Sequence, residues 1–363
     1  MTNILEQAKD IRKIWSGFQG ARVLITANNY RVFDHLEEQK PARKVAKELK
    51  TDIRATEILL DALTGLGLLK KKKSIYENAD IASRFLVTGK TYYQGDIIKH
   101  IETLWDNWSG FDTVLRSGTP FHKSHNHQAF ILGMHNLASL KAENVLKLMG
   151  LKGVKTALDL GGGPGTYSIE MAKKGIDVTL FDRPETIEIA KRLISKIPLN
   201  PPLTKGELKR SEPLAKVDSK TPTLKKGLAC PAGMGEGGFE KHFKKKISFM
   251  QGDFLHDDIG KGYDLIFASQ IIHSMSGKDN IHLLKKCRKA LNIGGRVVVQ
   301  EFLISNDLTQ PSNSSLFSIN MLVNTEGGRC YSPDEMKDWF LKTGFSNVRK
   351  KLVADGVLIS ATN

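Results

Sequence analysis

The spacing of apolar residues changes near residue 155 of this 363-residue chain. Before that point apolar residues recur three or four positions apart, as in Ile11, Ile14 and Phe18, which is the spacing of an amphipathic helix. After it, short apolar runs alternate with glycine-containing turns and helical segments. Such alternation is typical of a parallel sheet covered by helices. The pattern therefore predicts a helical amino-terminal part followed by an α/β part.

The first 95 residues are predicted to form a small, mainly helical domain. A short helix after Pro41 and a second helix ending at Gly65 precede two short strands near residues 68–76, which is the element order of a winged helix. The lysines at 70–73 are expected in the solvated turn of this hairpin. The exposed positions of the second helix include the acidic residues Asp52, Glu57 and Asp61. Because acidic groups repel phosphate, we expect dimerisation or substrate capping here and no nucleic-acid contact.

Residues 96–150 are predicted to form a second helical segment, which caps a substrate pocket. Met134 and His135 stand on an otherwise apolar helix of this segment, so we expect them to face the substrate. Three further histidines lie in a polar loop, at His122, His125 and His127. No carboxylate or cysteine stands near them in sequence, so the loop does not match a typical metal site. No metal is predicted.

A glycine cluster marks the beginning of the α/β part. The apolar run from Ala157 to Leu160 leads into this cluster and then into an amphipathic segment, which predicts strand, tight turn and helix. Glycines permit close approach of a ligand, and the free N–H groups of a helix start favour an anionic group. Thr166 stands where a dinucleotide fingerprint requires its third glycine. The stretch resembles instead the S-adenosylmethionine loop of Rossmann-like methyltransferases, with the pattern Asp159-x-Gly161-x-Gly163-x-Gly165.

Acidic residues follow the next two predicted strands. Asp182 ends the strand 177–181, about twenty residues past the glycine cluster, where a carboxylate can bind ribose hydroxyls. The alternative for Asp182 is an ordinary helix cap before Pro184. After the strand 247–251, Asp253 and Phe254 offer an acid and an aromatic ring that suit an adenine.

The fourth and fifth predicted strands also end in polar residues. The strand 263–269 ends at Ser269 and is followed by His273, and the strand 296–302 carries Glu301 near its end. Two further strands are expected near residues 348 and 358, which makes seven. Because ligands bind at the carboxyl ends of parallel strands, we expect these strand-end groups to share one site.

Taken together, these motifs resemble the large O-methyltransferase family that includes plant caffeate-type enzymes, acetylserotonin methyltransferase and bacterial polyketide and tetrapyrrole methyltransferases. The resemblance covers nearly the whole chain outside residues 198–242. It implies an α/β fold, with a Rossmann-like seven-stranded methyltransferase sheet at 96–363 behind a winged-helix dimerisation domain at 1–95. It also implies a homodimer. The motifs that carry it are the glycine loop, Asp182, Gly252-Asp253-Phe254, and Gly294-Gly295 before Glu301.

The resemblance further implies S-adenosyl-L-methionine as cofactor. The cofactor-binding residues expected from it are Asp159, Gly161, Gly163, Asp182, Asp253, Phe254 and Ser269. His273 falls at the position of the family's catalytic base, and Glu301 at that of the acid which orients it. The chain departs from the family at two places: the usual His-Asp-Trp reads His-Ser-Met from His273 onward, and Cys330 stands where a second acid is expected.

The favoured function is transfer of a methyl group to a hydroxyl of a small aromatic or polyketide-like acceptor, with His273 as general base. Two alternatives remain open. One is a carbon methyltransferase of a tetrapyrrole-type ring, where the acceptor carbon is itself nucleophilic. The other is a winged-helix regulator whose methyltransferase part senses a ligand.

Composition adds limits to this interpretation. Twelve Lys and Arg face five Asp and Glu between residues 196 and 246, so seven of the fifteen net positive charges lie in one segment. That charge is not a nucleic-acid groove, because residues 198–242 hold six of the twelve prolines, lack periodicity and are predicted to be a disordered insertion. Three dispersed cysteines, the lack of a membrane span and the lack of a signal-peptide pattern predict a cytoplasmic protein.

Overall fold

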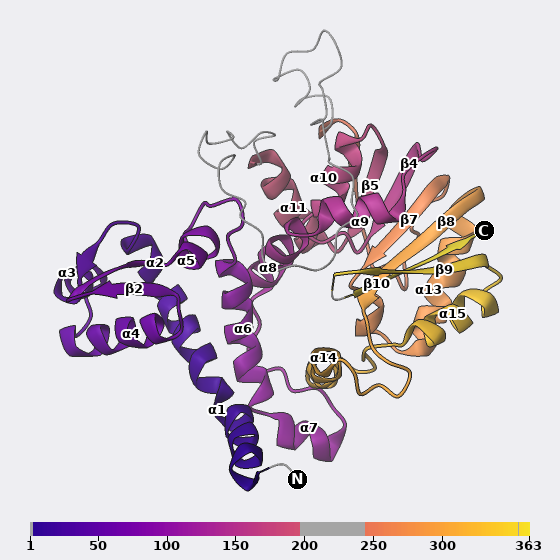
Figure 1. Cartoon of the computed structure of the whole chain (residues 1–363). Coiled ribbons are helices and arrows are strands. Elements are labelled where there is room, and N and C mark those ends of the chain that lie inside the picture. The colour runs from indigo at the N-terminus through magenta and orange to yellow at the C-terminus, as the bar shows by residue number, and fades with distance from the viewer. Residues whose placement is uncertain (1–2, 197–243, 355) are drawn as a thin grey trace, which may run out of the picture.

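Two separate sheets and the helices around them organise the chain (Figure 1). The computed structural model describes residues 3–196, 244–354 and 356–363. The insertion predicted at 198–242 lies outside the described residues. The larger sheet has the strand order β6-β5-β4-β7-β8-β10-β9, in which β6 to β8 are parallel and β10 runs antiparallel to both of its neighbours. The predicted seven-stranded α/β sheet is confirmed.

The strand order reverses beside β4. The chain moves outward from β4 through β5 to β6, and then returns to β7 on the opposite side of β4. In such sheets ligands bind where the order reverses, at the carboxyl ends of the strands. The strands of this sheet are β4 (Thr156–Leu160), β5 (Asp177–Asp182), β6 (Ile247–Gln251), β7 (Tyr263–Ser269), β8 (Leu291–Phe302), β9 (Ser346–Val353) and β10 (Gly356–Thr362).

Successive side chains of a strand point to opposite faces, so each central strand contributes to two hydrophobic clusters. Leu158 and Leu160 of β4 belong to one cluster and Ala157 to the other. The first cluster is covered by α13 (Gly277–Ala290) and α15 (Pro333–Lys342), and the second by α9 (Ala142–Met149), α10 (Thr166–Lys173) and α11 (Pro184–Lys196). With both faces covered, these strands are apolar along most of their length, which explains the continuous runs in the sequence.

The amino-terminal part has its own core and a three-stranded sheet of order β1-β3-β2. The expected order of helix, helix and hairpin is present. The lysine run differs from expectation: Lys70 to Lys72 lie in strand β2, where Lys70 pairs with Asp80 and Lys71 with Asp61. The elements are α1 (Ile4–Asn29), α2 (Val32–His35), β1 (Lys40–Pro41), α3 (Ala42–Leu49), α4 (Ile53–Gly65), β2 (Leu69–Lys72), β3 (Ile75–Asn78) and α5 (Asp80–Phe85).

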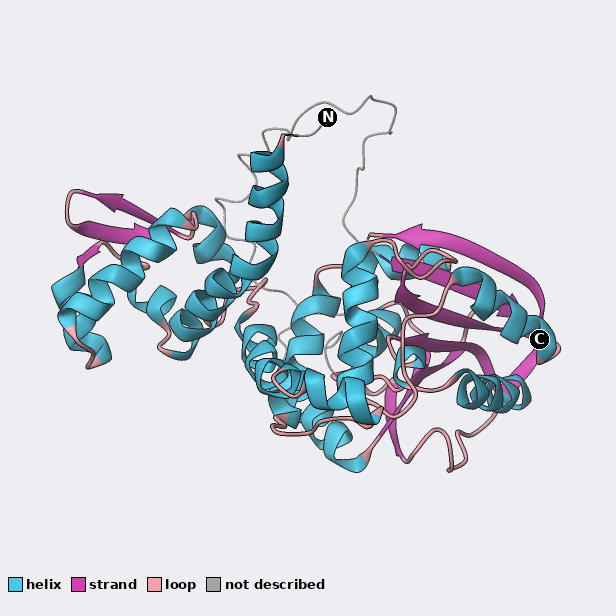
Figure 2. Ribbon diagram, turned by 90° about the horizontal axis from the view of Figure 1, so that it is seen from below, coloured by secondary structure: helices cyan, strands magenta, loops and turns pink. Residues whose placement is uncertain are grey.

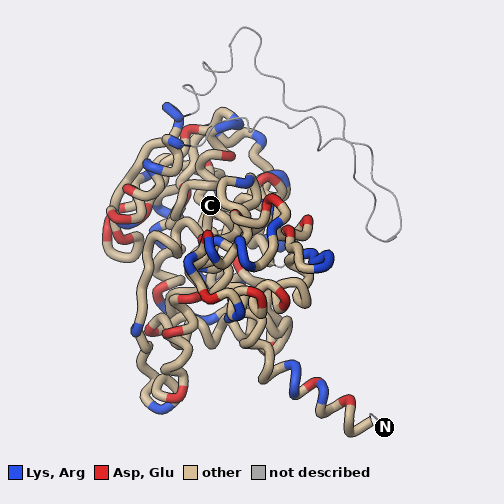
Figure 3. Tube along the Cα trace, turned by 90° about the vertical axis from the view of Figure 1, so that its left-hand side faces the viewer, with Lys and Arg blue, Asp and Glu red and all other residues tan. Residues whose placement is uncertain are grey.

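The first half of α1 extends away from the rest of the molecule (Figures 2 and 3). Its apolar side chains are exposed, and Ile14 and Trp15 keep 78% and 60% of their surface accessible. Figure 3 shows basic and acidic residues interspersed along the chain. None of the helices in the described residues is both long and apolar enough to cross a membrane.

Four helices lie between these two parts or beside the larger sheet: α6 (Gly95–Trp108), α7 (Phe111–Ser117), α8 (His127–Ser139) and α14 (Ser312–Asn324). Helices α6 and α8 pack closely, because a Cβ added at Gly133 would lie 2.9 Å from the Cα of Ile97. The Asn136 side chain accepts hydrogen bonds from the N–H groups of Asp96 and Ile97 at 3.1 and 3.2 Å. This pairing fixes α8 against the beginning of α6.

Candidate active site

The glycine turn after β4 adopts a backbone that other residues rarely adopt. Gly161 and Gly163 have φ angles of +63° and +54°. A Cβ at Gly161 would lie 2.8 Å from the Ile271 side chain, whereas a Cβ at Gly163 would meet no atom within 4 Å. The turn is therefore packed against Ile271 at Gly161, and the space next to Gly163 is open. A ligand can approach the backbone at that open position.

Asp182 binds the turn from the neighbouring strand. One carboxylate oxygen accepts a hydrogen bond from the Gly163 N–H at 2.8 Å, and the other accepts one from the Arg183 N–H at 2.7 Å. Burial raises the pKa of Asp182, and these backbone hydrogen bonds partly offset the rise. The carboxylate therefore shapes the glycine turn and accepts a hydrogen bond just before α11, and ribose binding by Asp182 stays a prediction.

Asp159 lies deeper than the sequence pattern indicated. Its carboxylate is only 1% exposed and accepts a hydrogen bond from the Ser168 hydroxyl at 2.6 Å. Burial raises the pKa of Asp159 to about 6. The side chain lies below the turn, where it links the end of β4 to α10.

The loop after β6 is held by several internal contacts. Asp253 accepts a hydrogen bond from the Leu255 N–H at 2.8 Å and lies 3.0 Å from the His256 ring nitrogen. Burial alone would raise the pKa of Asp253, but these bonds hold it below its ordinary value. The Lys286 amine of α13 donates to the backbone oxygens of Phe254 and Asp257 at 2.6 Å each. Asp253 and Phe254 thus stand on a loop of fixed shape.

A cluster of two hydroxyls and one side-chain amide lies at the ends of β7 and β8, and only its Ser269 was predicted from the sequence. The Gln300 side-chain oxygen accepts hydrogen bonds from Tyr167 at 2.9 Å and from Ser269 at 3.1 Å. Burial raises the pKa of Tyr167 to about 12, so its hydroxyl remains a donor at neutral pH. Ser269 is thereby oriented by a residue on the next strand.

His273 and Glu301 lie side by side, as their strand-end positions predict. The Nδ1 atom of His273 is 2.7 Å from a Glu301 oxygen, and both side chains are nearly buried. Glu301 also accepts hydrogen bonds from the N–H groups of Ile272 and His273, at 3.0 and 3.4 Å. These groups belong to the short 3-10 helix η2 (Ile272–Ser274). One carboxylate therefore holds both the imidazole and the turn that carries it.

Aromatic rings enclose the imidazole. Phe317 of α14 meets the His273 ring edge to face at a centroid distance of 5.0 Å, and Phe302 lies at 5.8 Å. Helix α14 is in turn joined to α6, because the Trp108 indole donates to the Asn320 side chain at 2.9 Å. Nothing in the sequence indicated this partner of Trp108.

His135 approaches the glycine loop. Its Nδ1 atom lies 2.9 Å from the Thr166 hydroxyl, at the first residue of α10. Burial lowers the pKa of His135, so the ring is neutral at pH 7. Met134 is its neighbour on α8 and is partly buried. Within the residues that the structure describes, no group of three or more His, Cys, Asp or Glu side chains is arranged to hold a metal ion.

Comparison with known proteins identifies the family. The model of the O-methyltransferase domain matches residues 105–212 and 236–346, and that of the O-methyltransferase dimerisation domain matches residues 13–88. This chain belongs to the O-methyltransferase family. The resemblance inferred from the motifs is thereby confirmed.

Individual relatives cover most of the chain. A 3-hydroxy-5-methyl-1-naphthoate 3-O-methyltransferase of Streptomyces sahachiroi is 27% identical over 85% of this chain and 80% of its own length. The acetylserotonin O-methyltransferase of Bos taurus is 26% identical over 93% and 92%. The structure of human N-acetylserotonin methyltransferase in complex with S-adenosylmethionine superposes with a TM-score of 0.79 at 22% identity, covering 98% of this chain and 97% of that one. This structural match, at 22% identity, supports the fold assignment.

Membership in the O-methyltransferase family makes this protein an S-adenosylmethionine-dependent methyltransferase. The residues at the strand ends fit that cofactor. The backbone is open above Gly163, and Asp182 and Asp253 stand at the ends of adjacent strands. Carboxylates suit a ligand that carries hydroxyls and a positive charge.

Proposed function

We propose that this enzyme methylates a hydroxyl group of a small aromatic or polyketide-like acceptor, with His273 as the general base. The observation that carries the proposal is the 2.7 Å contact between His273 and Glu301 beside the rings of Phe302 and Phe317. Aromatic rings pack favourably against an aromatic acceptor. The relatives named above methylate a hydroxynaphthoate and acetylserotonin according to their names.

The chemistry follows from the protonation of the pair. An ionised carboxylate only accepts hydrogen bonds, so Glu301 requires the proton of the neutral imidazole to be on Nδ1. The Nε2 atom then carries the free lone pair and accepts the proton of the acceptor hydroxyl. Glu301 stabilises the imidazolium that results. When bound, S-adenosylmethionine supplies the electrophilic methyl group.

The cofactor would be held by the glycine turn at Gly161 and Gly163, which is open at Gly163, together with Asp182, Asp253, Phe254 and Ser269. Asp159 would support this site from below through Ser168, since its carboxylate is buried. His135 and Met134 would line the acceptor side of the glycine loop. Positioning of donor and acceptor at this junction is worth roughly 7–11 kcal/mol in favourable cases.

We also propose that the protein is a homodimer that uses the exposed apolar face of α1. Several large apolar side chains of α1 are more than half exposed, and the dimerisation-domain match includes the end of this face from residue 13 onward. The domain boundary near residue 95 and the cytoplasmic location remain predictions.

The general-base assignment is tested by His273→Ala in single-turnover methyl transfer with pre-bound cofactor. A positioned base contributes roughly 10²–10⁴-fold, so we expect kcat to fall by about that factor while cofactor affinity stays constant. His282→Ala is the matched control, because His282 is an exposed residue of α13. A near-wild-type rate for His273→Ala would reject the base and favour the carbon methyltransferase. DNA binding without methyl transfer would favour the ligand-sensing regulator.

A further inference from the structure

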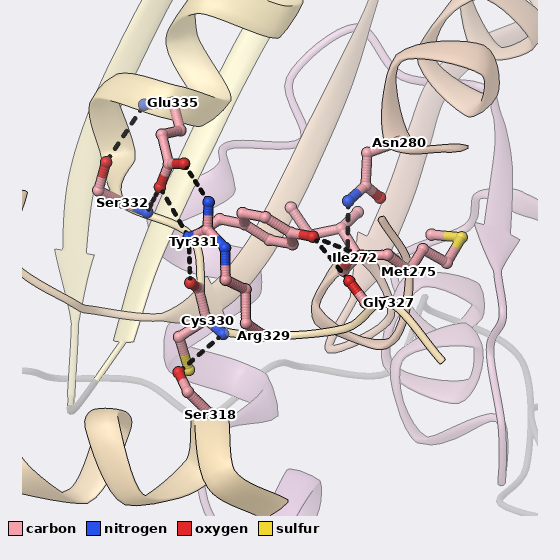
Figure 4. A network of polar contacts seen from close by, with 10 residues as sticks. All are labelled: Ile272, Met275, Asn280, Ser318, Gly327, Arg329, Cys330, Tyr331, Ser332 and Glu335. Atoms are coloured by element: carbon pink, nitrogen blue, oxygen red, sulfur yellow. Dashed lines mark hydrogen bonds and ion pairs between the residues drawn. The ribbon is translucent and has the colours of Figure 1, made fainter. Parts of the chain in front are cut away.

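The turn that carries His273 is contacted by a distant piece of the chain. Residues 327–332, here called the 327–332 segment, connect α14 to α15 and lie directly against residues 272–276 (Figure 4). A Cβ added at Gly328 would lie 2.3 Å from the backbone oxygen of His273. Only glycine therefore allows the two backbones to approach this closely.

Two backbone oxygens of this turn accept hydrogen bonds from side chains. The Asn280 side chain donates to the Ile272 oxygen at 2.9 Å, and the Tyr331 hydroxyl donates to the Met275 oxygen at 2.6 Å (Figure 4). On the opposite side, Glu301 accepts from the N–H groups of Ile272 and His273. The turn is thus fixed by hydrogen bonds at both ends, and Tyr331 supplies the one at its carboxyl end.

Tyr331 is itself rigidly placed. The Arg329 guanidinium lies 4.3 Å from the centre of its ring, and the Trp339 ring meets it edge to face at 4.7 Å. Arg329 in turn bonds both oxygens of Glu335, at 2.5 and 3.2 Å. Burial raises the pKa of Tyr331, so its hydroxyl stays protonated and available as a donor.

The same segment reaches the other side of the imidazole. The Cys330 N–H donates to the Ser318 hydroxyl of α14 at 3.1 Å, next to Phe317, whose ring packs against His273 (Figure 4). The 327–332 segment therefore contacts both the backbone of the turn that carries the imidazole and the helix whose Phe317 ring packs against the imidazole. Both contacts bear on the orientation of one side chain.

From this geometry we propose that Tyr331 is a positioning residue for His273. Its hydroxyl fixes the Met275 oxygen, and through it the turn that aims the Nε2 atom of His273 at the acceptor hydroxyl. The proposal rests on the proposed function for its catalytic consequence. Its structural content, that Tyr331 sets the orientation of the imidazole, holds independently of the reaction.

The test compares Tyr331→Phe with Tyr263→Phe. Tyr263 is an equally buried tyrosine whose hydroxyl donates to the Ile259 oxygen, at the opposite end of β7 from His273, so it controls for a lost buried hydroxyl. With N-acetylserotonin or 3-hydroxy-1-naphthoate as probe acceptor, we expect Tyr331→Phe to lower the single-turnover rate by about 10–100-fold, the scale of a misplaced catalytic group. Cofactor affinity from calorimetry should match wild type, and Tyr263→Phe should retain the wild-type rate.

A double-mutant cycle separates positioning from general destabilisation. If Tyr331 acts through His273, the loss caused by Tyr331→Phe should shrink to about twofold or less in the His273→Ala background. An equal loss in both backgrounds, or equal rates for Tyr331→Phe and Tyr263→Phe, would overturn the proposal. If His273→Ala alone leaves the rate unchanged, the proposed general base fails and the next measurement decides the role of Tyr331.

That measurement needs no acceptor. The chain has ten histidines, so labelling their Cε1 atoms with ¹³C gives a simple spectrum in which His273→Gln identifies the His273 signal. We expect Tyr331→Phe to shift or split this signal, and Tyr263→Phe to leave it as in wild type. An unchanged His273 signal in Tyr331→Phe would reject the positioning role.

Discussion

The proposed cofactor side and the proposed acceptor side of the active site are built in different ways. The proposed cofactor side is centred on the glycine turn with Asp182, supported by Asp159, all within two consecutive strands and the turn and helix between them. The acceptor side joins distant segments. The Trp108–Asn320 and Asn107–Asn324 hydrogen bonds connect residues 212 and 217 positions apart.

The difference shows which part of a site can be predicted from the amino-acid sequence. Backbone conformation is a local property, so a ligand held by a turn leaves glycines at fixed spacing. The contact between α6 and α14 requires only that suitable side chains meet, and many sequences satisfy that condition. Three predictions test whether the two sides also act independently, in order of decreasing effect, and a fourth tests the raised pKa of Asp159.

On the acceptor side, Glu301→Gln should lower kcat by roughly 10²–10³-fold. The amide can donate to Nδ1 of His273 and so stabilise the wrong tautomer, the effect known from the acid of serine-protease triads. Single-turnover kinetics and cofactor calorimetry measure the two sides separately. A parallel loss of cofactor affinity would show that the sides are coupled, contrary to the comparison.

On the cofactor side, Asp182→Ala should weaken S-adenosylmethionine binding by about 1–3 kcal/mol, or about 5–150-fold, with kcat at saturation nearly unchanged. The control is Asp177→Ala, which removes an exposed carboxylate at the opposite end of the same strand. Isothermal titration calorimetry reports both affinities. Equal affinities for the two variants would remove Asp182 from the cofactor site.

The smallest expected effect is a pH dependence confined to the cofactor side. The pKa of Asp159 is raised to about 6 in the folded protein, so this carboxylate gains its proton as pH falls through that value, and burial raises the pKa of Asp182 as well. Affinity for the cationic S-adenosylmethionine should therefore fall several-fold between pH 7.5 and 5, and affinity for uncharged-sulfur S-adenosylhomocysteine should fall less. Asp159→Asn should flatten this dependence.

The same shift has a consequence for stability. The folded protein binds the Asp159 proton more tightly than the unfolded chain does. Protonation of Asp159 therefore adds to the free energy of unfolding, fully below pH ~4, and this contribution is lost as pH rises through about 6. Asp159→Asn should therefore raise the free energy of unfolding of the ligand-free protein more at pH 7.5 than at pH 4. Urea denaturation at the two pH values measures this difference, and an equal change at both would contradict the raised pKa.

The sequence by itself determined the alternation of strands and helices, the glycine turn and the polar residues at the strand ends. It also placed His273 and Glu301 near the ends of two predicted strands, and the resemblance implied that they meet; the parallel pairing of β7 and β8, with Ser269 opposite Gln300, brings those ends to one edge. These features depend on local backbone preferences and on a side-chain alternation that repeats every two residues.

Only the tertiary structure decided what surrounds those groups. Asp159 turned out to lie buried against Ser168, and the contacts of Phe317 with His273 and of Tyr331 with Met275 left no pattern in the sequence. The same holds for the pairing of Lys71 in β2 with Asp61. The physical reason is that these contacts join segments far apart in the chain, where packing of whole elements, and not the preference of any one residue, selects the partners.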